Sequence, residues 1–129
     1  MQLETTEAVE IIDITDKVAR EVPADLDAGL CTIFVHHTTT GVVNNEAESG
    51  LLTDIESWLA DIVDDRGQYR HDQLDENAAA HLRSVLLGSS VSVPISDGAL
   101  QLGTWQRILF IEGDGPRTRT ISVIIVPSM

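Results

Sequence analysis

The feature that most constrains the fold is a pair of Asp-Gly turns dividing the last third of the chain into short apolar segments. Asp97-Gly98 follows the apolar run of residues 90–95, and Asp114-Gly115 follows the run of residues 105–112. Asp-Gly pairs between apolar runs are a strong signal for tight hairpins, because both residues tolerate a positive φ. A further apolar run covers residues 118–126. We therefore expect antiparallel strands here and not a series of β-α-β units.

Three segments have the spacing of helices. Apolar residues at positions 14, 18 and 22 predict a short helix that Pro23 ends. Asn77 is a candidate N-cap for a helix that Gly88 closes, with an apolar face at Ala78, Leu82, Val85 and Leu86. Residues 47–63 predict a longer helix with an apolar stripe toward the core. The stripe consists of Leu51, Ile55, Trp58, Leu59 and Ile62.

A buried strand is predicted for residues 30–37, and residues 4–12 have extended character. Three short helices and about seven mostly antiparallel strands predict an α+β fold, mostly an antiparallel β-sandwich. The 129 residues are enough for one core, so we expect a single domain over residues 1–129. Cys31, the only cysteine, lies in an apolar run and is expected to be a core thiol.

The net charge of −13 limits the partners and suggests the solvent. Such a charge repels a phosphate backbone, so nucleic acid is not expected as a partner. The acids are dispersed and Lys17 is the only lysine, which favours a protein from a halophilic, high-salt cytoplasm. No run reaches the roughly 20 apolar residues that cross a bilayer, and residues 1–7 do not resemble a signal peptide. We therefore predict a cytoplasmic protein without a membrane partner.

Histidines and carboxylates supply the candidate chemistry. His37 ends the buried strand, Asn45-Glu46 precedes a helix, and His71 lies in a loop. Asn77 and His81 share one face of the third helix. Such donors from separate elements can form a site for Zn²⁺, Mn²⁺ or Mg²⁺, or an acid–base pair. A purely structural role for any one histidine is an equal alternative.

A second group of residues has the character of a phosphate site. Gly88-Ser89-Ser90 offers backbone N–H groups and hydroxyls, and Arg117 and Arg119 lie beside a glycine turn. The alternative is that these arginines pair with surface acids. Trp105, after Gly103-Thr104, either lines a pocket or belongs to the core, and we expect the core.

Taken in order, these motifs resemble the YjbQ-like family, whose members are identified as secondary thiamine-phosphate synthases. The resemblance covers residues 30–126, nearly the whole chain. The matching residues are His37-Thr38-Thr39 with Gly41, Asn45-Glu46, Asp54, Tyr69-x-His71-Asp72, Asn77-x-x-x-His81-Leu82-Arg83-x-x-Leu86-x-Gly88-x-Ser90, Gly103-Thr104-Trp105-Gln106, and Glu112 with Gly115-Pro116-Arg117.

The resemblance implies a homotrimer with sites near subunit contacts and histidines gathered in a cleft that holds a metal ion or an anion. It implies the joining of hydroxymethylpyrimidine diphosphate to thiazole phosphate, with loss of diphosphate. Many relatives have another histidine just before His81, where this chain has Ala78-Ala79-Ala80. His36 has no consistent counterpart and is given a structural role.

The residue roles implied for this chain are as follows. The catalytic residues would be His37, Glu46, His71 and His81, and the three histidines would also bind Mg²⁺ or Zn²⁺. The phosphate-binding residues would be Arg83, Gly88, Ser89, Ser90 and Arg117. Asn45, Asn77 and Trp105 would line the substrate pocket, with the pyrimidine stacked on Trp105.

Two other functions fit the same residues. In a metal-dependent hydrolase of a small phosphorylated metabolite, three histidines and a carboxylate would hold Zn²⁺ and activate water. In a non-catalytic trimer, the same pocket would bind a metabolite or a metal without turnover.

Overall fold

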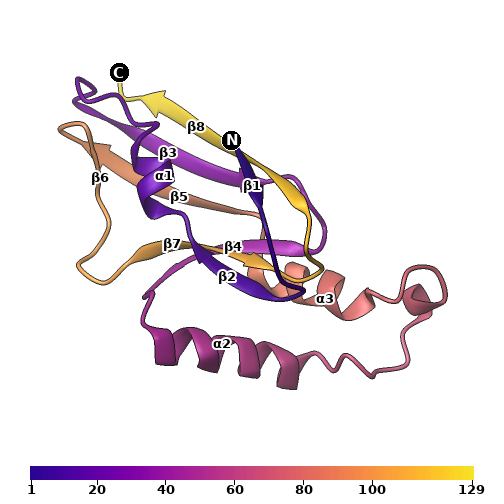
Figure 1. Cartoon of the computed structure of the whole chain (residues 1–129). Coiled ribbons are helices and arrows are strands. Elements are labelled where there is room, and N and C mark those ends of the chain that lie inside the picture. Colours follow the sequence, from indigo (N-terminus) through magenta and orange to yellow (C-terminus); the bar gives the residue numbers. More distant parts are fainter.

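The computed structural model describes residues 1–129 and contains two antiparallel sheets (Figure 1). One sheet has five strands in the order β1-β8-β3-β5-β6, and the other has three in the order β2-β7-β4. The strands are β1 Gln2–Glu4, β2 Glu10–Asp13, β3 Ala28–Val35, β4 Thr40–Asn45, β5 Ser90–Ser96, β6 Ala99–Leu100, β7 Arg107–Glu112 and β8 Thr118–Pro127. With the three helices described below, the α+β prediction is confirmed.

The two Asp-Gly turns have different roles. Asp97 and Gly98 have φ values of 51° and 73°, and they join β5 to β6 in a hairpin in which Ser96 pairs with Ala99. The segment that contains Asp114-Gly115 instead carries the chain from β7 in one sheet to β8 in the other. The prediction of a hairpin at this second turn is therefore wrong.

The core lies between the two sheets. Ile33 and Val35 of β3 meet Val42 of β4 and Ile108 and Phe110 of β7, all nearly inaccessible to solvent. Helix α1, Thr15–Ala19, adds Val18 to the same cluster. Cys31 is buried among these residues, as predicted, and its burial raises the pKa of the thiol.

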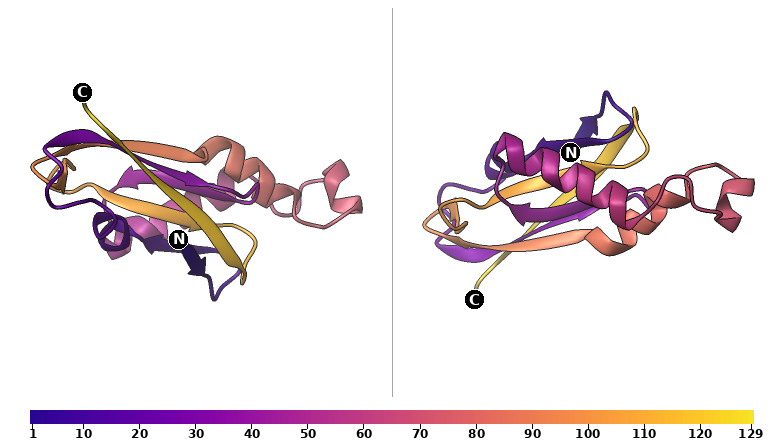
Figure 2. Two further views of the ribbon diagram at one scale, coloured as in Figure 1. Left: turned by 90° about the horizontal axis from the view of Figure 1, so that it is seen from above. Right: turned by 90° about the horizontal axis from the view of Figure 1, so that it is seen from below.

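Helix α2, Ser49–Ile62, runs along the outer side of the three-stranded sheet (Figure 2). Of its predicted apolar stripe only Leu59 is fully buried, while Trp58 and Ile62 are 57% and 47% exposed. A short 3₁₀ turn, η1, spans Arg70–Gln73. No helix in the chain combines the length and apolar character needed to cross a membrane.

Helix α3, Ala78–Leu87, turns most of its predicted apolar face outward, with Ala78 as the exception. Its buried residues are Ala78, Ala79, Ala80 and Arg83, whereas Leu82, Val85 and Leu86 are 42%, 80% and 58% exposed. Small alanines allow the helix to approach the sheet closely. At Gly41 of β4 an added Cβ would lie only 2.5 Å from the Cβ of Leu87.

Candidate functional site

Two adjoining hollows between the end of β3 and helix α3 form one groove. They measure about 740 and 330 Å³ and share His36, His37, Thr38 and His81. The larger hollow continues along Phe34, Val35, Ser84, Val85, Gly88 and Ser89. The smaller one has no apolar residue and continues along Thr39, Asp75, Asn77, Asp114, Arg117 and Arg119. We call the two together the histidine groove.

His37 lies two residues beyond the end of β3 and is held by the backbone of β8. Its Nε2 accepts a hydrogen bond from the Thr120 N–H at 2.8 Å. A nitrogen that accepts carries no proton, so the neutral ring has its proton on Nδ1. Burial lowers the pKa of His37, and the positive charge of Arg119 lowers it further, against the opposing charge of Glu112. His37 is therefore neutral at pH 7.

A buried ion pair adjoins His37. Glu112 is 0% exposed and Arg119 is 4% exposed. Arg119 donates to both carboxylate oxygens of Glu112, from Nε at 2.8 Å and from Nη2, and Nη2 also donates to Thr39 Oγ1 at 2.9 Å. The Thr5 hydroxyl donates to Glu112 Oε1 at 2.7 Å. This network joins β7, β8, the N-terminal segment and the loop after His37.

His81 lines the groove and His71 supports it. The two rings pack edge to face with centroids 4.6 Å apart. His71 lines neither hollow, and its Nε2 is buried without a hydrogen-bond partner. Of these two predicted catalytic residues, only His81 lines the groove.

Asn77, Asp114 and Arg117 form a chain of hydrogen bonds along the smaller hollow. Asn77 Nδ2 donates to Asp114 Oδ2 at 2.9 Å, and Arg117 donates to Asp114 O at 2.8 Å and to Asp114 Oδ2 at 3.1 Å. The Arg117 side chain remains 55% exposed. Asn77 occupies the predicted N-cap position, but its side chain makes no capping hydrogen bond, and Asp72 accepts the Ala78 N–H.

Part of the Gly88–Ser90 segment lines the groove. Gly88 ends α3 with a φ of 85°, a left-handed conformation that favours glycine. Gly88 and Ser89 line the larger hollow, whereas Ser90 is exposed at the start of β5 and lines neither hollow. Only the first two predicted phosphate contacts of this segment therefore lie in the groove.

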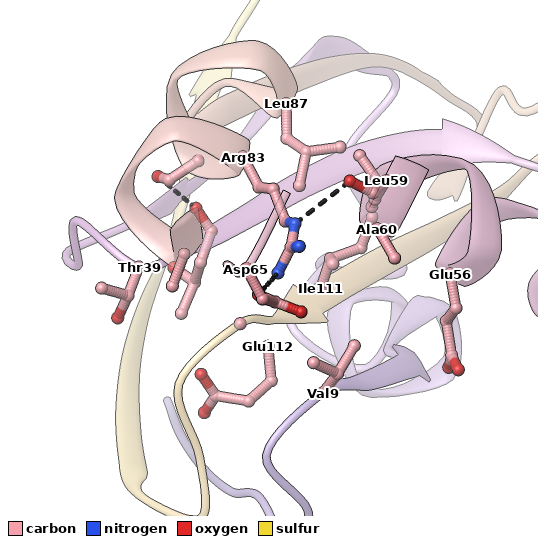
Figure 3. Close-up of a pocket in the computed structure, with 14 residues that line it drawn as sticks. Val9, Thr39, Glu56, Leu59, Ala60, Asp65, Arg83, Leu87, Ile111 and Glu112 are labelled. Carbon is pink, nitrogen blue, oxygen red and sulfur yellow. Dashed lines mark hydrogen bonds and ion pairs between the residues drawn. The ribbon is translucent and has the colours of Figure 1, made fainter. Parts of the chain in front are cut away.

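Arg83 lies outside the groove, in a small cavity of about 60 Å³ beneath α2 and α3 (Figure 3). Its Nε donates to Leu59 O at 3.2 Å, its Nη2 to Val63 O at 2.6 Å, and its Nη1 pairs with Asp65 at 2.9 Å. All three nitrogens of the guanidinium are thereby engaged at the C-terminal end of α2. Arg83 thus lies apart from the groove and links α3 to the end of α2.

Glu46, Asn45 and Trp105 lie at the opposite end of β4. Strand β4 begins where Thr40 pairs with Glu112, beside the groove, and ends where Asn45 pairs with Arg107. Over this length a strand extends by about 17 Å. Trp105 is 72% exposed, so its assignment to the core is wrong. The residues predicted to form a single site therefore lie at the two opposite ends of β4.

The predicted metal ligands do not form a metal site in this arrangement. No group of three or more histidine, cysteine or carboxylate side chains is placed to hold a metal ion. His37 Nε2 receives a backbone N–H, and Glu46 lies at the far end of β4. The residues present do not fit the Mg²⁺ or Zn²⁺ site that the resemblance implied.

The structure adds Thr39, Asp75 and Asp114 to the predicted site residues, and Glu112 behind them. One sequence signal could have identified Glu112. It ends the apolar run Ile108–Ile111, and a carboxylate buried at such a position requires a charged partner. Arg119 is seven positions away, across the turn.

The sequence similarity to known proteins covers nearly the whole chain. A UPF0047 protein from Archaeoglobus fulgidus is 53% identical over 123 residues, which cover 95% of this chain and 96% of that protein. The UPF0047 protein YugU from Bacillus subtilis is 38% identical over 128 residues and covers 93% of this chain and 92% of its own length.

Solved structures match the fold equally well. A YbjQ-like protein of unknown function from Sulfolobus solfataricus P2 superposes with a TM-score of 0.95 at 37% identity, covering 99% of this chain and 94% of the other. A hypothetical protein from Aeropyrum pernix K1 has a TM-score of 0.94 at 37% identity, covering 99% and 96%. The family model described as UPF0047 protein YjbQ-like matches residues 1–128, and the chain therefore belongs to the YjbQ-like UPF0047 family.

Proposed function

We propose that the histidine groove is the active site of a transferase of the thiamine-phosphate synthase type, acting on small phosphorylated substrates. The observation that carries the proposal is the position of His37 and His81 where the two hollows meet. The smaller hollow is wholly polar and includes two of the chain's eight basic residues, Arg117 and Arg119. The larger hollow is partly apolar and suits a ring.

The reaction requires one carbon–oxygen bond to break and one carbon–nitrogen bond to form. The electron pair of the bond between the pyrimidine methylene and the diphosphate leaves with the diphosphate, and the lone pair of the thiazole nitrogen forms the new bond. Holding both substrates in line supplies much of the rate in such a reaction. The groove would serve this purpose with one substrate in each hollow.

Specific roles for the groove residues follow from their donors. His81 would donate a proton to the departing diphosphate, since it lines both hollows. His37 would donate from Nδ1 to a phosphate oxygen, and Arg117 would contact a phosphate with the terminal nitrogen that Asp114 does not bind. Asn77, Gly88 and Ser89 would contact the substrates. His71 would act only by supporting His81.

No step of this proposal passes through a metal ion, because the side chains present do not form a three-donor site. The same arrangement does not favour the alternative of a zinc hydrolase, which needs three protein ligands on one ion. Binding without turnover remains a separate outcome of the test below.

We propose further that the protein acts as a homotrimer. Leu82, Val85 and Leu86 expose the apolar face of α3. Phe34, at 37% exposure, lies with Val85 in the larger hollow of the groove. Exposed apolar patches of this kind mark association surfaces. Contact between copies at this face would bring the groove to a subunit boundary. The acidic composition fits a cytoplasm with concentrated salt.

The test is the conversion of the two thiamine precursors to thiamine phosphate by the purified protein in concentrated KCl with added Mg²⁺. We expect His81→Ala to lose activity by at least about a hundredfold, as for a general acid. Because His71 acts through His81, His71→Phe should retain more activity than His71→Ala. Asp61→Asn, an exposed change on α2, is the matched control.

A folded wild-type protein that forms no thiamine phosphate would overturn the transferase proposal. Release of inorganic phosphate from either precursor would indicate the hydrolase instead. Saturable binding of a precursor without turnover, insensitive to His71→Ala, would indicate the binding module.

A further inference from the structure

Trp105 stands between two hollows far from the histidine groove. The hollows measure about 390 and 260 Å³ and share Glu46 and Trp105. The first is also lined by Asp13, Ala47, Glu48, Thr104 and Arg107, and the second by Asn44, Asn45 and Gln106. We call this region the tryptophan hollow. It has no residue in common with the histidine groove.

The loop that carries Trp105 is held in place while the indole is left accessible. Gly103 N donates to Gln106 Oε1 at 2.8 Å, and Gln106 N donates to Gly103 O at 3.0 Å. These two bonds close the loop on both sides of Trp105, whose side chain is 72% exposed. An indole presented on a fixed loop is a platform for a planar ring.

Two hydrogen-bond acceptors beside this platform have no partner within the chain. Asn44 Oδ1 is buried and has no partner, and the half-buried carboxylate of Glu46 makes no hydrogen bond or ion pair. The nearest cation, Arg107, donates to Asp13 at 2.6 Å and to Asp16 at 3.3 Å. Unpaired acceptors beside an aromatic face call for a ligand that brings its own N–H donors.

We propose that the tryptophan hollow binds a planar nitrogen heterocycle with an exocyclic amino group, which stacks on Trp105 and donates to Glu46 and Asn44. Carboxylate and amide oxygens accept from exocyclic amino groups in nucleobase recognition. The inference does not rest on the function proposed for the groove, because binding here is measured without turnover and at other residues.

The test uses the full-length protein in KCl with cytidine as the probe and uridine as its comparator. Cytidine carries an amino group where uridine carries a carbonyl oxygen. In a Trp58→Phe background Trp105 is the only tryptophan, so one indole N–H signal reports on the site by NMR. We expect cytidine to shift this signal saturably and uridine to bind at least about fivefold more weakly.

Three variants and two controls identify the contacts, with binding followed by saturation transfer to cytidine. Trp105→Leu should weaken binding by about tenfold or more, and Trp105→Phe by less. Glu46→Gln keeps the shape of the side chain and should weaken binding about fivefold. Asp61→Asn and the groove variant His81→Ala should leave cytidine binding unchanged.

Equal binding of cytidine and uridine would overturn the proposal. So would the absence of any shift at millimolar cytidine, or binding that persists in both Trp105→Leu and Glu46→Gln. Trp105→Phe keeps the test decisive if the leucine variant does not fold.

Discussion

Glu112 is a carboxylate without solvent access, and its ionised form depends on hydrogen bonds within the chain. Removing one partner of a buried pair leaves the other charge uncompensated. We predict that Glu112→Gln lowers the free energy of unfolding by about 3–5 kcal/mol, measured by urea denaturation in constant KCl. The control is Asp16→Asn, whose side chain is 77% exposed beside Arg107 and should cost less than about 1 kcal/mol. Equal effects of the two changes would contradict this account.

The same network predicts how stability depends on pH. Burial alone would raise the pKa of Glu112, but hydrogen bonds from Arg119, Thr5 and the Asp114 backbone outweigh it and place the pKa below 4.5. The unfolded chain therefore takes up the proton first. The stabilisation is complete above pH 4.5 and is lost as the pH falls through the lower folded pKa.

We therefore predict that the free energy of unfolding falls with acidification below this pH and that Glu112→Gln shows a shallower decline. The pKa of Asp13 is also lowered, so Asp13 contributes to the pH dependence of stability in the same direction. Because both proteins contain Asp13, its contribution cancels when their slopes are compared. Denaturation curves at a series of pH values measure both slopes. Parallel slopes for the two proteins would rule out Glu112 as the source.

At the scale of elements, α2 is attached to the rest of the chain by few contacts. Only Leu59 of the helix is buried, and Arg83 binds the carbonyl oxygens of Leu59 and Val63 at its C-terminal end. Cations at this end of a helix also interact favourably with its dipole. Segments with few buried contacts open locally before the whole protein unfolds.

We predict that Arg83→Met increases amide hydrogen exchange in residues 49–63 by about tenfold or more, while β3 and β8 change less. The hydrogen bonds lost are charge-assisted, and the methionine keeps most of the apolar stem. Mass spectrometry of exchanged peptides measures the effect, with Arg66→Met as the exposed control on the neighbouring loop. Uniform acceleration over all elements would indicate global destabilisation instead.

The elements that could be predicted from sequence are those set by local patterns. The limits of α2 and α3 agree with the spacing of their apolar residues, and α3 ends at Gly88 as predicted. The predicted hairpin forms at the Asp97-Gly98 pair, where both residues have a positive φ. The crossing from β7 to β8 could not be predicted, because it depends on a long-range choice of partners. There β8 pairs with β3 and β1, not with β7.

The orientation of α3 and the position of Trp105 differ from the predictions for a related reason. Periodicity indicates which face of a helix is apolar, and in a lone chain that face is expected to be buried. Here the alanines and Arg83 are buried, whereas Leu82, Val85 and Leu86 are exposed. Residues that lie together in a motif series also need not meet in space. Glu46 and Trp105 match the family pattern as closely as His37 does, yet they lie at the other end of β4.

At the scale of the whole molecule, the exposed apolar residues of α3 bear on assembly. Val85 and Leu86 are 80% and 58% exposed, which is costly for a chain that stays monomeric. We predict a trimer by light scattering and its dissociation in Val85→Glu combined with Leu86→Glu. The introduced glutamates of neighbouring copies would meet at the subunit contact and repel one another. Glu56→Gln, on the exposed side of α2, should leave the mass unchanged, and a monomeric wild type would refute the prediction.

The dispersed charge of −13 predicts how the stability of the protein depends on salt. Repulsion among exposed acids destabilises the folded chain, and salt shortens its range from about 10 Å at 0.1 M to about 3 Å at 1 M. The free energy of unfolding should therefore rise with KCl concentration. Salt also strengthens apolar burial, so a charge variant is needed to separate the two causes.

Glu21→Gln, Asp25→Asn and Asp61→Asn together remove three of the 21 acidic charges at exposed positions. If repulsion is the cause, this triple variant is more stable than the wild type at low KCl, and the difference narrows as KCl is raised. Denaturation at matched KCl concentrations measures both. A triple variant with the same salt dependence as the wild type would assign the effect to apolar burial, and the acidic surface would then carry no argument for a high-salt cytoplasm.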